Sequence, residues 1–437
     1  MRGTALNWLM TLRIDKPPFL ITLDIVAAVL ALYLLLRPTA RRTAAGLIAA
    51  VVGGLVGWLV VWLADDVFNV FGVGLTPVTT LWAVLGFAGV SLAIANLFRS
   101  RWWRKLIAIV SIPVFLVTAA AGINVDFGAY RDLNDALGVV PYKALDLHAQ
   151  RGEVLDIGTD YASTATPGQT IPAKGEVGTV RIPASESHFP ARSAVVYLPP
   201  IALTDKPPAL PVLYALSGQP GAPADMFTAG RIAPAMDAFA AAHGGYAPIV
   251  VAADQLGGPG RNPMCVDSRA YGNSATYLLT DVRAWVSSHL RVSSDPAAWG
   301  VFGYSQGATC AVQFATGHPE LFGSALASSS ELGPTLGDRT QTIDTGFGGS
   351  AKAYEAAQPL AMMAAKAPYK DSTIVFGVGQ EDTKYTAFAR TLDAAATKAG
   401  IHSELLISPG SAHDWNTVRH TLQFGFPAIA RQMGLEG

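Results

Sequence analysis

The clearest sign of chemistry is a serine between two glycines, in a Gly-Tyr-Ser-Gln-Gly sequence centred on Ser305. An apolar run over 298–302 precedes this G-x-S-x-G motif, and a helical pattern over 306–316 follows it. Small flanking residues permit the tight strand-to-helix turn that lifts a nucleophilic hydroxyl clear of a sheet. The N-terminus of the following helix also directs its amides at developing negative charge. We therefore predict that Ser305 is a nucleophile.

A nucleophilic serine needs a histidine base, and the base needs a carboxylate that orients it. His413 lies in a loop directly after a strand predicted over 403–408, where catalytic groups gather in open α/β sheets. His402 precedes that strand, and His420 falls within the last predicted helix. We therefore predict His413 as the base.

The orienting acid should follow the strand predicted over 372–377, because in α/β folds with this serine motif the acid comes between serine and histidine along the chain. Two carboxylates, Glu381 and Asp382, occupy the loop after that strand. Asp382 is the preferred acid, and Glu381 remains the alternative.

An oxyanion hole needs two main-chain amides. The first is the N–H of Gln306, next to the nucleophile. The second should come from the loop after a strand predicted over 211–216, where Gly218 permits a sharp turn. Gln219 carries the predicted donor, since the following Pro220 has no N–H.

The elements that must position these residues alternate from about residue 178 onward. Strands are predicted over 193–198, 211–216, 248–253, 298–302, 324–328, 372–377 and 403–408, and helices over 231–242, 276–290, 306–316, 384–399 and 417–433. Several strands are continuously apolar, as strands buried on both faces should be. The predicted fold class is α/β, with a mostly parallel sheet covered by helices on both faces.

The first third of the chain carries four apolar stretches, 19–36, 44–63, 77–98 and 106–125. Each has the length that a helix needs to cross roughly 30 Å of hydrocarbon. Charged residues make up only 14% of the chain, against roughly 25% in soluble proteins. We therefore predict an all-α anchor of four transmembrane helices over 1–125, a connector over 126–177 and a catalytic domain over 178–437.

Basic residues predict which side of the membrane each loop faces. The loops after the first and third spans are basic, whereas the loop after the second carries Asp65 and Asp66. The basic residues are Arg37, Arg41, Arg42, Arg99, Arg101, Arg104 and Lys105. The two basic loops should be cytoplasmic, which places the connector and the catalytic domain outside.

Taken as a set, the motifs resemble the esterase D-like family of α/β-hydrolases, which includes feruloyl esterases and mycolyltransferases. The resemblance spans about 178–435 and rests on the Tyr-Leu-Pro-Pro run 197–200, the strand and loop 211–218, the serine motif with 317–323, the loop 379–382 and 413–415. It implies Ser305, Asp382 and His413 as a catalytic triad. The four-helix anchor resembles a membrane-bound actinobacterial subgroup. Many members have His-Gly where this chain has Ser217-Gly218, but mycolyltransferases also lack that histidine.

The only cysteines are Cys265, in the long loop after the predicted strand 248–253, and Cys310, on the helix after Ser305. In this fold those elements are neighbours at the active-site edge, and an exported domain permits oxidation. We predict a disulfide between them, with two buried free thiols as the alternative.

The predicted substrate is an acyl ester, lipid or glycolipid, at the outer face of the membrane. The segment 331–367 either forms a cap whose apolar residues line an acyl groove or is an ordinary helical excursion. The candidate lining residues are Leu332, Leu336, Phe347, Leu360, Met362 and Met363. The predicted function is hydrolysis or acyl transfer through an acyl-enzyme.

Other classes of function find less support in the sequence. The net charge of −1 and the absence of a long basic run argue against nucleic acid, and no motif predicts a metal or a cofactor. Asp24 is the only ionisable residue within the spans, too little for a transporter. An inactive α/β-hydrolase fold that serves as an envelope binding or scaffold protein is the alternative to the enzyme.

Overall fold

The structure is a computed structural model that describes residues 8–68, 70, 72–147 and 170–436. Its contacts divide the chain into two compact units. The first is Met1–Val140 with Gly410–Asn416, and the second is Pro141–Pro409 with Thr417–Gly437. The first unit is helical, and the second is a sheet with its covering helices.

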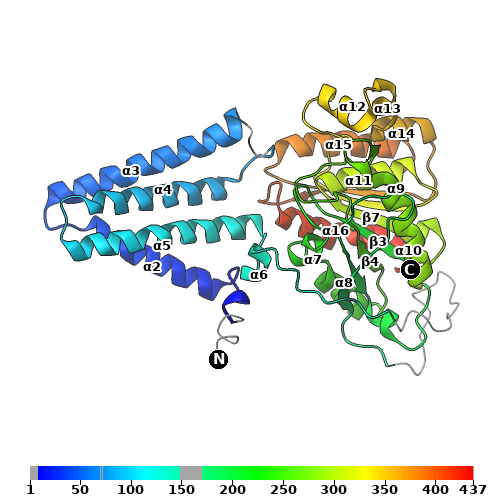
Figure 1. Ribbon diagram of the computed structural model, residues 1–437, viewed down its shortest axis with the longest axis horizontal. Coiled ribbons are helices and arrows are strands. Elements are labelled where there is room, and N and C mark those ends of the chain that lie inside the picture. The colour runs from blue at the N-terminus through cyan, green and yellow to red at the C-terminus, as the bar shows by residue number, and fades with distance from the viewer. Residues whose placement is uncertain (1–7, 69, 71, 148–169, 437) are drawn as a thin grey trace. The chain divides into compact units, whose positions relative to one another are not determined.

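Four long apolar helices form the N-terminal unit (Figure 1). They are α2 (Pro17–Leu35), α3 (Ala40–Trp62), α4 (Pro77–Leu97) and α5 (Trp102–Phe127), and a π-helical turn, Leu63–Val67, continues α3. Each is long enough to cross a bilayer, and many of their large apolar side chains are exposed. Such an extensive apolar surface suits lipid rather than water.

Glycines allow close packing within this unit. A Cβ added to Gly53 of α3 would lie 2.2 Å from the Ser91 hydroxyl of α4, and one added to Gly57 would lie 2.9 Å from the Phe87 Cβ. Neither position has room for a side chain, so α3 and α4 approach closely, as small residues permit in membrane helices.

Two basic loops lie at the same end of this helical unit. Arg37, between α2 and α3, donates a hydrogen bond to the Asn96 side-chain oxygen at 2.5 Å. Arg104, at the start of α5, donates to the same oxygen at 2.9 Å and to the Leu34 carbonyl near the end of α2 at 2.8 Å. The predicted cytoplasmic loops are therefore on one side of the bundle.

An eight-stranded sheet forms the frame of the second unit, in the order β1-β2-β4-β3-β7-β8-β9-β10. Its members are β1 (Glu176–Val180), β2 (Ala194–Leu198), β3 (Val212–Leu216), β4 (Ile249–Ala252), β7 (Trp299–Tyr304), β8 (Ser324–Ser328), β9 (Thr373–Gly379) and β10 (His402–Ser408). The six strands β4-β3-β7-β8-β9-β10, in sheet order, are parallel to their neighbours. The pairs β1–β2 and β2–β4 are antiparallel. The mostly parallel sheet confirms the predicted fold class.

All seven predicted strands occur in this sheet, and most of their ends shift by one or two residues. Two features escaped the sequence prediction: the edge strand β1, and a short hairpin of β5 (Asp267–Ser268) and β6 (Gly272–Asn273). Every residue of β3, β7, β8 and β9 is buried, as a sheet covered on both faces requires.

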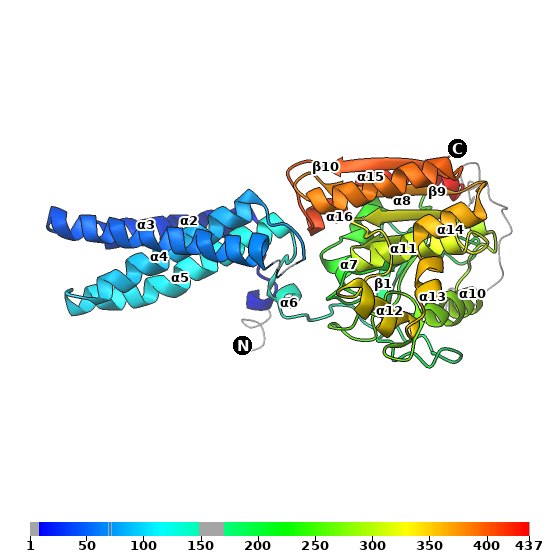
Figure 2. The same ribbon diagram turned by 90° about the horizontal axis from the view of Figure 1, so that it is seen from above.

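Helices cover this sheet on both faces. The longer ones are α8 (Ile232–Ala242), α11 (Gln306–Gly317), α15 (Thr383–Lys398) and α16 (Trp415–Gln432). Figure 2 shows α15 running along β9 and β10. All of α11 is buried, so the helix that follows Ser305 lies inside the unit.

The segment after β8 folds as three short helices, α12 (Arg339–Phe347), α13 (Ala351–Ala356) and α14 (Pro359–Lys366). At the end of α11 the Thr316 hydroxyl lies 3.7 Å from the Met362 sulfur, and the Tyr369 hydroxyl donates to the Thr316 carbonyl at 2.6 Å. Met362 and Tyr369 therefore join the end of this segment to α11.

Candidate active site

Ser305 lies at the turn between β7 and α11. Its φ of 55° and ψ of −116° belong to neither a strand nor a helix, and backbone strain of this kind gathers at functional sites. Ser305 is partly exposed, whereas its neighbours Tyr304 and Gln306 are buried. The turn therefore presents one hydroxyl at the carboxyl end of a central strand, as the motif predicts.

The two glycines of the motif are needed for close backbone approach. A Cβ added to Gly303 would lie 2.0 Å from the Gly307 carbonyl oxygen. One added to Gly307 would lie 2.2 Å from the Leu216 carbonyl oxygen at the end of β3. No side chain fits at either position, so the turn lies tightly against the neighbouring strand.

Hydrogen bonds fix the backbone of Ser305 on both sides. The Ser305 N–H donates to the Ser328 carbonyl at the end of β8, over 2.8 Å. The Ser305 carbonyl accepts from the Thr309 N–H at 3.0 Å and from the Thr309 hydroxyl at 3.2 Å. The backbone of the serine is thereby held in one orientation, as the predicted role of a nucleophile requires.

The predicted oxyanion loop lies directly against this turn. A Cβ on Gly218 would be 3.1 Å from the Tyr304 ring and 3.4 Å from the Ser305 Cβ. The next residue is Gln219, whose main-chain amide is one predicted donor. Within the described part of the chain, neither this amide nor that of Gln306 donates to another residue. The predicted role of both amides in an oxyanion hole requires this.

The two candidate acids differ sharply in burial. Asp382 is 1% exposed and is the N-cap residue of α15, where its carboxylate accepts a hydrogen bond from the Tyr385 N–H at 3.3 Å. Glu381 is exposed. A carboxylate that orients a histidine is normally buried and hydrogen-bonded. The environment therefore favours Asp382.

His413 lies in the loop after β10, between β10 and α16, and is 7% exposed. Because β10 is parallel to β9, this loop leaves the sheet at its carboxyl edge. The loop is braced by the Asp414 carboxylate, which accepts the Ala412 N–H at 2.8 Å. His402 begins β10 at the opposite edge and is exposed, so it is poorly placed to act with Ser305.

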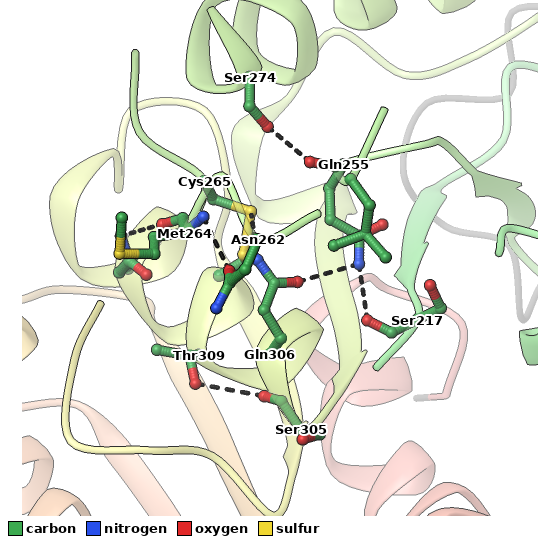
Figure 3. The surroundings of a disulfide bond; sticks show 12 residues. Ser217, Gln255, Asn262, Met264, Cys265, Ser274, Ser305, Gln306 and Thr309 are labelled. Atoms are coloured by element: carbon green, nitrogen blue, oxygen red, sulfur yellow. Dashed lines mark hydrogen bonds between the residues drawn. A yellow bond between two sulfur atoms is a disulfide. The ribbon is translucent and has the colours of Figure 1, made fainter. Parts of the chain in front are cut away.

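The structure joins Cys265 and Cys310 as a disulfide, with sulfurs 2.00 Å apart. The sulfur of Cys265 lies 3.9 Å from the side-chain nitrogen of Gln306, so the disulfide is next to the turn at Ser305 (Figure 3). The described residues contain no cluster of histidine, cysteine or acidic side chains that could hold a metal.

Two polar residues at this edge escaped the sequence prediction. Gln255 is fully buried in the loop after β4, and Glu331 is partly buried after β8. Burial raises the pKa of Glu331 to about 7, an effect that the Lys384 charge and a hydrogen bond from Thr335 only partly oppose. Both residues follow predicted strands at the carboxyl edge of the sheet, and that position is the signal that could have revealed them.

Similar folds occur among solved structures. A ferulic acid esterase is 17% identical with a TM-score of 0.49, covering 59% of this chain and 98% of that chain. An S-formylglutathione hydrolase from Agrobacterium tumefaciens is also 17% identical with a TM-score of 0.49, covering 61% of this chain and 99% of that chain.

Sequence comparison reaches further. Residues 189–427, more than half of the chain, match the family described as "Putative esterase". An uncharacterized protein of Corynebacterium glutamicum is 32% identical over 368 residues, 81% of this chain and 83% of that protein. This alignment is longer than 178–437 and the connector together, so it includes part of the helical region. The chain therefore belongs to this esterase family and is a carboxylic ester hydrolase of the α/β-hydrolase fold.

Proposed function

We propose that this protein is an extracytoplasmic serine esterase or acyltransferase that acts on acyl esters at the membrane. Ser305 is the nucleophile, His413 the base and Asp382 the acid that orients it. The observation that carries the proposal is the strained, partly exposed Ser305 beside two main-chain amides that donate to no other described residue. That combination is what acyl transfer through a serine requires.

In the first step the Ser305 oxygen forms a bond to the ester carbonyl carbon while its proton passes to His413. The Gln219 and Gln306 amides stabilise the negative charge that develops on the carbonyl oxygen. When the tetrahedral intermediate collapses, the carbon–oxygen bond to the alcohol breaks and His413 returns the proton to the leaving alcohol. Water or a sugar hydroxyl then attacks the acyl-enzyme in the same manner and releases Ser305.

The arrangement of charges in the helical unit supports an extracytoplasmic catalytic domain. Arg37 and Arg104 share one acceptor, Asn96, so the two basic loops lie at one end of the bundle. Basic loops face the cytoplasm. Three candidate spans, α3, α4 and α5, follow the loop that carries Arg37. If this loop is cytoplasmic, three crossings bring the chain to the outer side, which supports an extracytoplasmic catalytic domain.

The proposed substrate is a lipid or glycolipid ester within reach of the bilayer. Four apolar helices on the same chain as an esterase suit an ester that resides in a membrane better than one that diffuses freely. Whether water or a hydroxyl accepts the acyl group depends on how well the bound acyl-enzyme is shielded from solvent.

A fluorophosphonate probe tests the enzyme against the inactive-scaffold alternative. The full chain in detergent should be labelled at Ser305, and Ser305→Ala should lose both labelling and ester cleavage while its melting temperature stays unchanged. The residual rate should be that of the oxyanion hole and substrate binding alone. An unlabelled, inactive wild-type protein would support a binding or scaffold role.

A chain-length series of nitrophenyl esters tests the substrate class on the same preparation. A lipid esterase should prefer octanoate and longer chains, because each buried methylene adds about 0.8 kcal/mol. Preference for acetate, together with no turnover of lipid esters, would leave a generic carbohydrate esterase.

A further inference from the structure

Three neighbouring parallel strands end around Ser305. They follow the sheet order β4-β3-β7. The loop after β4 carries Gln255, the loop after β3 carries Ser217 and Gln219, and the turn after β7 carries Gln306. The two proposed oxyanion donors therefore come from different strands, and nothing in the covalent chain fixes the distance between them.

One side-chain amide links these two strand ends (Figure 3). The Gln255 Nε2 donates to the Ser217 carbonyl oxygen at 2.6 Å and to the Gln306 side-chain oxygen at 3.1 Å. All three residues are buried. Hydrogen bonds shielded from water hold their geometry more strongly than exposed ones.

The orientation of the Gln255 amide follows from its partners. A carbonyl oxygen can only accept, so the nitrogen of the amide must face Ser217. The Gln306 amide in turn directs its nitrogen toward the Cys265 sulfur, which leaves its oxygen for Gln255. The Ser274 hydroxyl donates to the Gln255 carbonyl at 2.8 Å and fixes the backbone of that residue.

We infer that Gln255 is a positioning residue that holds the two halves of the oxyanion hole at a fixed separation. By binding the Ser217 carbonyl it orients the backbone that leads to the Gln219 amide, and by binding the Gln306 side chain it restrains the residue that carries the second amide. This role rests on the proposed function. It needs no contact between Gln255 and the substrate.

Contacts of Arg192 also stabilise the loop after β3, and they do not involve the Gln255 side chain. Arg192 donates to the Gly221 carbonyl at 3.0 Å and forms an ion pair of 2.7 Å with the fully buried Asp254. The far end of the loop is therefore fixed by other residues. Loss of the Gln255 amide should displace the near end of the loop without unfolding it.

The first test is Gln255→Leu in the full chain, which removes the donor while keeping most of the side-chain volume. A displaced oxyanion donor weakens only the transition state, so kcat should fall by more than about 5-fold with KM unchanged. Gln313→Leu is the matched control, because Gln313 is also a buried glutamine, donating to the Met264 carbonyl at 3.3 Å away from the oxyanion loop. It should retain the wild-type kcat.

The second test, Gln255→Glu, distinguishes a lost hydrogen bond from a loss of packing. A protonated glutamic acid keeps one O–H donor, whereas the carboxylate keeps none and faces two acceptor oxygens. The activity of this variant relative to the wild type, measured at each pH, should therefore fall as the pH rises. A loss of packing alone would leave that ratio independent of pH at every pH where thermal melting shows the variant to be folded.

The outcomes separate this role from the proposed function. If the wild type shows no turnover that depends on Ser305, the proposed function and this role both fail. If the wild type is active while folded Gln255→Leu stays within about 5-fold of its kcat, or the Gln255→Glu ratio is flat across pH, only the positioning role is refuted.

Discussion

Asp382 accepts the main-chain N–H of Tyr385 at the first turn of α15, over 3.3 Å. Asp382 therefore caps the N-terminus of α15, and its side chain is also buried at the carboxyl edge of the sheet. Its neighbour Glu381 is exposed to solvent. Two adjacent carboxylates thus occupy different environments, and only one of them suits the proposed triad.

This difference predicts the effects of two isosteric substitutions. Asp382→Asn should lower kcat strongly, by about 10⁴-fold if the role matches that of the triad aspartate in serine proteases, because the histidine loses the carboxylate that orients it. Glu381→Gln should leave kcat within about 2-fold of the wild type, since this residue is exposed. Steady-state kinetics with a nitrophenyl ester gives both numbers. If Glu381→Gln instead lost most of its kcat while Asp382→Asn kept nearly all of it, Glu381 would be the orienting acid and Asp382 would not.

Gly307, two residues after Ser305, provides a steric prediction. A Cβ at Gly307 would meet the Leu216 carbonyl oxygen at 2.2 Å, so Gly307→Ala must displace β3 or α11. We expect a lower melting temperature and a large loss of fluorophosphonate labelling. Gly260→Ala is the control, because a Cβ there meets nothing within 4 Å. Equal melting temperatures for the two variants would contradict this account of the turn.

The sequence predicted those parts of the molecule that depend on local pattern. The turn at Ser305 was recognised because its glycines and flanking elements are contiguous, and the buried strands because they are continuously apolar. The edge strand β1 was missed because its Glu-Val-Gly-Thr-Val run carries no clear alternation. Gln255 and Glu331 were missed for another reason: their burial depends on chain segments far away in the sequence, which residue type alone does not reveal.

The basic loops predict the side of the membrane on which Gly175, in the chain just before β1, lies. An alkaline phosphatase fused after Gly175 should be active, because that reporter works only outside the cytoplasm. A fusion after Arg41, in the first turn of α3 next to the first basic loop, should be inactive and serves as the control. Activity at Arg41 and none at Gly175 would invert the proposed orientation.

Glu331 supplies a prediction about pH and stability. Desolvation raises its pKa from 4.5 to about 7 in the folded protein, despite the opposing Lys384 charge and the Thr335 hydrogen bond. The folded state therefore holds a proton that the unfolded state releases at lower pH. The contribution of Glu331 to the stability of the fold is therefore most favourable below about pH 4.5, becomes less favourable as the pH rises to about 7, and then levels off.

Glu331→Gln mimics the protonated acid and should escape this loss. The free energy of unfolding of the variant, relative to the wild type, should therefore increase between pH 5 and pH 8, by on the order of 2 kcal/mol. Thermal melting of both proteins in the same detergent at several pH values measures the difference. Glu381→Gln, at an exposed carboxylate, should show no such trend. A difference in unfolding free energy between Glu331→Gln and the wild type that stayed constant from pH 5 to pH 8 would contradict this prediction. Glu331 would then already be ionised in the folded protein, and an interaction stronger than the one with Lys384 would have to offset its desolvation.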